Sequence, residues 1–164
     1  MIKREICYFF IVPILIIGGC RTSHELPLSL TKHKKNVSVS ITVRTHEFNE
    51  YQFVKDTVEF EISFENQNNS PVAKGQIGMA TFEQCPVRYN QGILPPSITG
   101  IEWIVSCERM GKLFAQDPLE NKQMEIWVSP EDENGQRSFE IRYTDGMAKF
   151  PMAGGTWAPE LIGH

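Results

Sequence analysis

The stretch Val58-Glu59-Phe60-Glu61-Ile62-Ser63-Phe64-Glu65 alternates apolar and polar side chains without a break. Because successive residues of a β-strand point to opposite faces of the sheet, this alternation predicts a strand with an apolar inner row and a polar outer row. A shorter run over residues 37–44 has the same period of two, with three valines and an isoleucine at alternate positions. Both runs are typical of strands that bury one face.

Further strands are predicted over residues 76–83, 98–106, 123–128 and 137–144. Segments rich in asparagine, glycine, proline and acidic residues separate these runs, and the segment 130–135 predicts a hairpin between the last two. About seven short strands in one chain predict an all-β fold, specifically a single antiparallel β-sandwich. The sandwich is broadly immunoglobulin-like in architecture only, because Cys85 and Cys107 are too close in sequence for the inter-sheet disulfide of that family.

The first twenty residues follow a different pattern. Lys3 and Arg4 make a short positive start, residues 6–17 are almost all apolar, and Gly18-Gly19 leads directly into Cys20. This order is typical of a secretory signal, and the apolar run is too short for a stable membrane span. An ordinary signal peptide or an uncleaved anchor, with Cys20 there by chance, is the alternative.

The end of this segment resembles the lipobox of bacterial lipoproteins. The resemblance implies that the signal peptide, residues 1–19, is removed and that acyl chains such as palmitate on Cys20 hold the protein at a membrane. In the enteric version of this class an aspartate after the cysteine retains the protein in the inner membrane. Arg21 therefore favours the periplasmic face of the outer membrane, within the bacterial cell envelope.

The rest of the chain divides into a tether and one domain. Residues 20–36 mix serine, threonine, proline and charge without a sustained apolar period, which predicts a flexible tether. Residues 37–164 are long enough for a single sandwich domain, and they contain no internal repeat. Of 16 basic and 20 acidic residues, removal of the signal leaves 14 and 19, a formal charge of −5. A basic face for nucleic acid is therefore not expected.

Cys85 and Cys107 are the two cysteines that remain once Cys7 leaves with the signal and Cys20 carries lipid. In an oxidising periplasm the simplest expectation is a disulfide between them. A metal pair or a reactive thiol is the alternative, although no Cys-x-x-Cys motif occurs.

No catalytic motif is present. The serine elbow of hydrolases, the two-histidine zinc helix and the phosphate-binding glycine loop are all missing. His46 and Glu47 adjoin on a predicted strand, where neighbours face opposite sides, so a shared site is not expected. We therefore predict no catalytic residue, no metal and no cofactor, although a triad assembled from dispersed residues would leave no such motif.

Partner binding is the remaining expectation, and acidic side chains are its first candidates. Glu59, Glu61 and Glu65 share one strand face, while Glu131, Asp132 and Glu133 share a loop tip. Charge on an exposed strand also serves simply to prevent pairing with other chains, which is the simpler explanation. Trp157 lies in a glycine-rich carboxy-terminal stretch that either covers a sheet edge or forms an exposed contact patch.

Together these patterns predict a non-enzymatic, lipid-anchored binding protein that faces the periplasm, attached to the membrane through Cys20 and contacting a protein partner. An accessory or assembly part of an envelope complex is one such role. An immunity protein or inhibitor that neutralises a periplasm-delivered toxin, such as one from a type VI secretion system, is the alternative. An enzyme is a third possibility.

Overall fold

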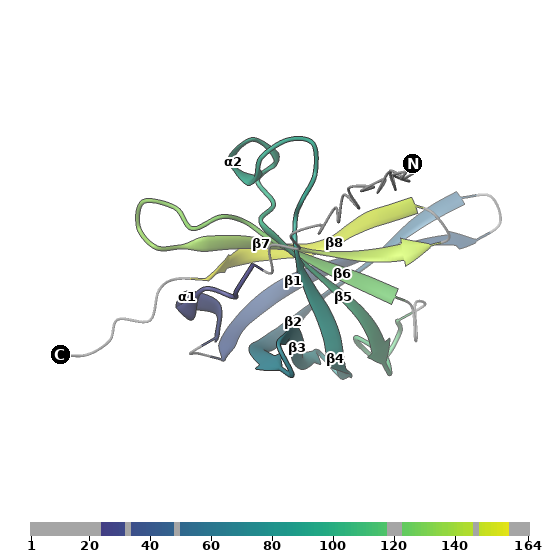
Figure 1. The fold of residues 1–164 in the computed structure, drawn as a ribbon. Helices are drawn as coiled ribbons and strands as arrows, with labels where there is room; N and C mark the ends of the chain where they lie inside the picture. The colour runs from purple at the N-terminus through teal and green to yellow at the C-terminus, as the bar shows by residue number, and fades with distance from the viewer. Residues whose placement is uncertain (1–23, 32–33, 48–49, 118–122, 146–147, 158–164) are drawn as a thin grey trace, which may run out of the picture.

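The structure is a computed structural model, and it describes residues 24–31, 34–47, 50–117, 123–145 and 148–157 (Figure 1). These residues form eight strands and two single-turn helices, joined by turns and loops. In chain order they are α1 (Leu28–Thr31), β1 (Lys35–Glu47), β2 (Glu50–Gln67), β3 (Ser70–Ile77), β4 (Ala80–Tyr89), α2 (Pro96–Thr99), β5 (Trp103–Met110), β6 (Gln123–Val128), β7 (Arg137–Asp145) and β8 (Ala148–Trp157). The predicted signal peptide and Cys20 lie outside the described residues.

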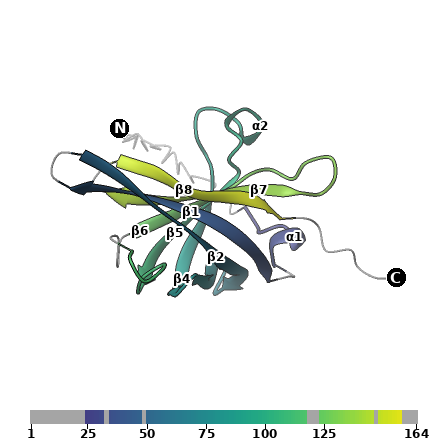
Figure 2. The same ribbon diagram turned by 180° about the vertical axis from the view of Figure 1, so that it is seen from behind.

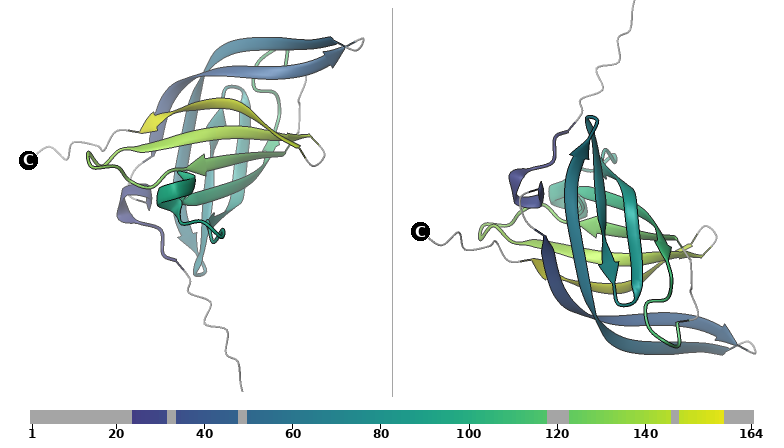
Figure 3. Two further views of the ribbon diagram at one scale, coloured as in Figure 1. Left: turned by 90° about the horizontal axis from the view of Figure 1, so that it is seen from above. Right: turned by 90° about the horizontal axis from the view of Figure 1, so that it is seen from below.

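Every strand pairs antiparallel with the next one along the chain, so the eight strands form one sheet in the order β1 to β8. The sheet curls until β8 lies against β1, and it is nearly closed into a barrel (Figures 2 and 3). At the junction, the Tyr143 hydroxyl donates to the Arg44 carbonyl at 3.3 Å, and the Arg44 guanidinium lies 3.9 Å from the Phe150 ring centroid. Strand twist accumulating over a continuous meander produces this closure.

The all-β, antiparallel prediction is confirmed, whereas the sandwich of about seven strands is not. Two packed sheets require strands that leave one sheet for the other, and here each strand hydrogen-bonds to its sequence neighbour instead. The predicted hairpin around residues 130–135 is confirmed by the pairing of β6 with β7. A strand over 148–157 was not predicted at all.

The interior holds the apolar rows of the strands. Phe60, Ile62 and Phe64, the inner row of the opening stretch, are all buried. The Phe139 ring packs on Trp157 with 4.6 Å between ring centroids, and Phe60 packs on Phe139 at 5.1 Å. Trp157 is only 3% exposed, so it belongs to the core and has no surface to offer the partner suggested from its glycine-rich surroundings.

The barrel has two unlike ends. At one end, here called the loop end, lie the β2–β3 hairpin, the β4–β5 loop (residues 90–102), the β6–β7 loop (129–136) and the segment 24–31. Leu26 and Leu30 of that segment are buried in the core, so the described part of the predicted tether packs on the barrel. At the other end, here called the hairpin end, the long β1–β2 hairpin extends beyond the remaining strands (Figure 3).

A buried ion pair closes the hairpin end. Arg109 belongs to the inner row of β5, and its Nη1 lies 2.7 Å from Oδ2 of Asp117, with both side chains completely buried. The same carboxylate oxygen accepts a 2.8 Å hydrogen bond from the backbone N–H of Leu113, whose side chain is also buried. The pair therefore fastens the segment that follows β5 over this end of the core.

Candidate functional site

A groove of about 930 Å³ opens at the loop end, and we call it the mouth groove. It lies where the β2–β3 hairpin, the end of β4, the start of β5 and the amino-terminal segment come together. Its lining includes His24, Glu25, Asn66, Asn69, Tyr89 and Trp103. The mouth of a barrel is a common place for a binding site, because the rigid sheet holds the surrounding loops in position.

Three aromatic rings form one wall of the groove. Tyr89 and Trp103 are directly opposite each other in the β4–β5 ladder, and their rings meet edge to face with 5.3 Å between centroids. The His24 ring stacks on Tyr89 at 3.8 Å, with an interplanar angle of 16°. This stacking places the amino-terminal segment against the groove and makes His24 part of its wall.

Trp103 contributes a hydrogen-bond donor that is not used within the described residues. Its Nε1 is buried and lacks an acceptor in that part of the chain. A buried donor without an acceptor costs about 1–3 kcal/mol. Because this atom has almost no solvent-exposed surface, the donor does not face the open groove.

The rim of the groove is polar. Asn66 and Asn69 come from the β2–β3 hairpin, whose two-residue turn needs positive φ at Asn68 and Asn69 (50° and 63°). Asparagine is well suited to such turns, which is why this rim carries amides. Exposed Arg88 and Gln91 add further donors on the β4 side.

The residues lining the groove include no serine, threonine or cysteine that could act as a nucleophile. Among the residues that the structure describes, no group of three or more histidine, cysteine or acidic side chains is placed to hold a metal ion. Aromatic rings framed by amides are typical of surfaces that bind a polar chain or loop of another molecule.

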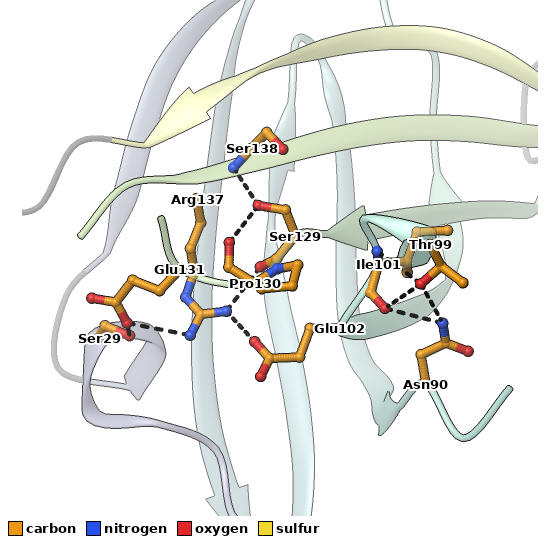
Figure 4. A network of polar contacts seen from close by, with 10 residues as sticks. All are labelled: Ser29, Asn90, Thr99, Ile101, Glu102, Ser129, Pro130, Glu131, Arg137 and Ser138. Atoms are coloured by element: carbon orange, nitrogen blue, oxygen red, sulfur yellow. Dashed lines mark hydrogen bonds and ion pairs between the residues drawn. The ribbon is translucent and has the colours of Figure 1, made fainter. Parts of the chain in front are cut away.

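Hydrogen bonds hold the β4–β5 loop beside the groove (Figure 4). The backbone N–H of Asn90 donates to the Glu102 carbonyl at 2.7 Å, and its side-chain Nδ2 donates to the Ile101 carbonyl at 3.0 Å. The Thr99 hydroxyl accepts from the backbone N–H of Ile101 at 3.3 Å. These bonds close the base of the loop against the strands.

Arg137 connects the β4–β5 loop and the β6–β7 loop at the loop end (Figure 4). Its buried guanidinium forms an ion pair with Glu102 and donates to the Ser129 carbonyl at 2.8 Å. It also lies 3.4 Å from Glu131, which accepts a hydrogen bond from the Ser29 hydroxyl at 3.2 Å. Glu131, one of the predicted partner-binding acids, is thus engaged in holding α1 and the β6–β7 loop together.

The predicted acidic residues do not form one surface. On the outer face of β2, Glu61 pairs with Lys34, and the Glu65 carboxylate lies 3.3 Å from the Lys74 ammonium. Hydrogen bonds from Gln67 and Lys74 lower the pKa of Glu65 below its usual value. Glu59 is exposed on the same face.

The second acidic group lies on another side of the barrel, because β2 and the β6–β7 loop are separated by several strands in the sheet order. Asp132 Oδ1 accepts hydrogen bonds from the backbone N–H groups of Asn134 and Gln136, so this carboxylate stabilises its own loop. Glu133 remains exposed at the tip.

Cys85 and Cys107 lie side by side in the core. A bulge in β4 with Gln84 at φ 54° turns Cys85 inward, and Cys107 belongs to the inner row of β5. Both thiols are free in this structure, and the Cys85 thiol donates to the Glu83 carbonyl at 3.7 Å. Burial, followed by the hydrogen bond to Cys85, raises the pKa of Cys107 far above its usual value. The disulfide remains a prediction.

We expect dithiothreitol to lower the melting temperature of protein isolated from an oxidising compartment. A disulfide closing the short Cys85–Cys107 loop would stabilise the fold by about 3 kcal/mol on the chain-entropy model. The Cys85→Ser variant is the matched control, since its melting curve should not respond to the reductant. An unchanged wild-type curve would show that the two thiols are not bonded.

Comparisons of this chain with protein-family models, with curated proteins and with solved structures find no match. In the described ranges, no helix is long and apolar enough to cross a membrane.

The side chains of His46 and Glu47 lie outside what the structure describes. None of the groove residues was predicted as a site, because His24, Asn66, Tyr89 and Trp103 belong to no common motif and come together only in the folded chain.

Proposed function

We propose that this chain is a lipid-anchored binding protein of the bacterial envelope, which faces the periplasm and holds a protein partner at the mouth groove. An accessory or assembly role in an envelope complex suits it best. The observation that carries the proposal is the stacking of His24 on Tyr89 in the groove wall, four residues after the lipobox-type Cys20. An acyl anchor at Cys20 would therefore hold the groove close to the membrane on which a partner complex is built.

The architecture supports binding as the activity. The nearly closed sheet is a rigid support, and it carries several loops together at one end, where they form a contact surface. Hydrogen bonds of Asn90 and Arg137 fix these loops before any partner arrives. A fixed surface loses little conformational entropy on association, which favours affinity.

An immunity protein or inhibitor against a periplasm-delivered toxin is the second candidate. Glu133 at the tip of the β6–β7 loop and Glu59 on β2 are exposed, and neither forms an ion pair with another residue that the structure describes. Exposed carboxylates of this kind suit a basic partner and speed its association.

The first test is crosslinking in living cells, with a photoreactive amino acid at Asn69 on the groove rim. The matched control carries the same amino acid at Thr57, which is exposed on the outer face of β2. We expect one dominant adduct from position 69 and none from position 57. A resident envelope protein in the adduct would support the assembly role, and a secreted toxin would support the inhibitor role.

The same cells test the anchor. Cys20→Ser should leave the signal uncleaved or release the protein from membranes, and it should reduce the adduct from position 69. Unchanged processing and membrane association in this variant would contradict the lipoprotein assignment. Equal adducts from positions 69 and 57 would contradict the groove as the binding surface.

A further inference from the structure

The β4–β5 loop exposes large apolar side chains beside the groove. Ile93 is fully exposed, Ile98 is 67% exposed and Leu94 is 51% exposed. The stretch 91–101 contains no charged residue. A cluster of exposed aliphatic side chains on a folded domain is commonly an interaction surface, because leaving it in water is unfavourable.

The loop presents these side chains outward by its own construction. In α2, the backbone N–H of Ile98 donates to the Pro95 carbonyl at 2.9 Å, and that of Gly100 donates to the Pro96 carbonyl at 2.8 Å. Gly100 ends the turn at φ 69°, a conformation that glycine adopts without strain. The loop projects from the barrel with α2 at its far side (Figure 1). Hydrogen bonds therefore hold the loop backbone in one conformation, while its apolar side chains remain exposed to solvent.

The position of the loop relative to the amino terminus indicates what its exposed apolar side chains contact. His24 stacks on Tyr89, and the loop begins at the next residue, Asn90. Cys20 precedes His24 by four residues, and four extended residues span at most about 14 Å. If acyl chains on Cys20 lie in a bilayer, the loop must then lie close to the surface of that bilayer.

We propose that the β4–β5 loop dips into this bilayer, placing Ile93, Leu94 and Ile98 at the boundary between head groups and acyl chains. This inference rests on the lipid anchor of the proposed function. The contact is apolar, since the loop has no cation to attract anionic lipid. The anchor and the loop together would fix the orientation of the barrel, with the hairpin end directed away from the membrane.

This orientation restricts how a partner reaches the mouth groove. With the loop at the lipid surface, the adjoining mouth groove opens next to the membrane rather than toward the open periplasm. A partner segment that enters the groove would then have to approach along the membrane surface.

The test uses the full lipidated protein in phosphatidylcholine vesicles whose acyl chains carry bromine, which quenches tryptophan on contact. Leu94→Trp places a reporter on the loop. Met79→Trp, at an exposed site of the hairpin end, is the control. The wild-type emission of the three native tryptophans is subtracted from that of each variant. We expect the emission added by Leu94→Trp to fall roughly twofold relative to unbrominated vesicles, with little change for Met79→Trp or wild type, and without dependence on salt.

Flotation of the vesicles separates the two proposals. Protein that floats with the vesicles while the loop tryptophan is not quenched would overturn the loop contact and leave the anchor standing. Quenching that requires anionic lipid would also overturn the apolar contact. Protein that fails to float would contradict the anchor, and the loop proposal with it.

Discussion

Asp117→Ala should reduce the free energy of unfolding by about 3–5 kcal/mol, because it leaves the buried Arg109 guanidinium without its counter-charge. The carboxylate has two structural roles. It lies 2.7 Å from Arg109 Nη1, and it accepts the backbone N–H of Leu113 at 2.8 Å. Nε and Nη2 of the same guanidinium are buried without acceptors among the described residues, and the Gly111 carbonyl, which accepts from Nη1 at 3.3 Å, carries no charge to replace the carboxylate.

Urea unfolding of the purified protein measures this loss. Glu65→Gln is the control, because it removes an ion pair at the surface, where solvent screens the charges and little stability is lost. The double variant Arg109→Met with Asp117→Leu should recover most of the stability, since it removes both buried charges together. A loss below about 1 kcal/mol for Asp117→Ala would show that the segment after β5 does not close the core through this pair.

Trp157→Ala should cost a similar amount, about 3–5 kcal/mol, through the cavity that it leaves in the core. The indole packs on three phenylalanine rings, with 4.6 Å to Phe139, 6.2 Å to Phe60 and 6.3 Å to Phe64 between ring centroids. The phenylalanines come from β2 and β7 and the indole from β8, so the truncation removes contacts across the junction where the barrel closes.

Thermal or urea unfolding would detect the loss. Phe53→Ala on the β1–β2 hairpin is the matched control, because that ring is 61% exposed and its removal should change stability by about 0.5 kcal/mol or less. Equal effects of the two substitutions would contradict the placement of Trp157 in the core.

Strand β8 shows why one element escaped prediction. Its residues include Pro151 and the pair Gly154-Gly155, which by composition indicate an irregular segment. In the sheet, Gly155 lies opposite Phe139, and a Cβ at Gly155 would be 2.9 Å from the Phe139 ring. The glycine is therefore required by a partner residue on β7, and that requirement is not visible from the local sequence.

Barrel closure also escaped prediction. The alternation over 58–65 correctly predicts which side chains of β2 face inward, and the same holds for Phe139, Ile141 and Tyr143 on β7. Alternation has the same form in a sandwich and in a barrel, because it reports two faces of a strand and not the neighbours of that strand. The order β1 to β8, which excludes two separate sheets, appears only in the pairing.

Local sequence alone was sufficient for the inner and outer rows of β2 and β7 and for an asparagine-rich connection over residues 66–71, since each depends on residues adjacent in the chain. The two-residue turn at 68–69 is seen only in the structure. The mouth groove needed the tertiary structure. His24, Asn66, Tyr89 and Trp103 come from four separate segments, and only closure of the sheet brings them together. The same holds for the burial of Trp157 and for the adjacent Cys85 and Cys107 thiols. Strand period is a property of consecutive residues, whereas these contacts depend on which distant strands become neighbours.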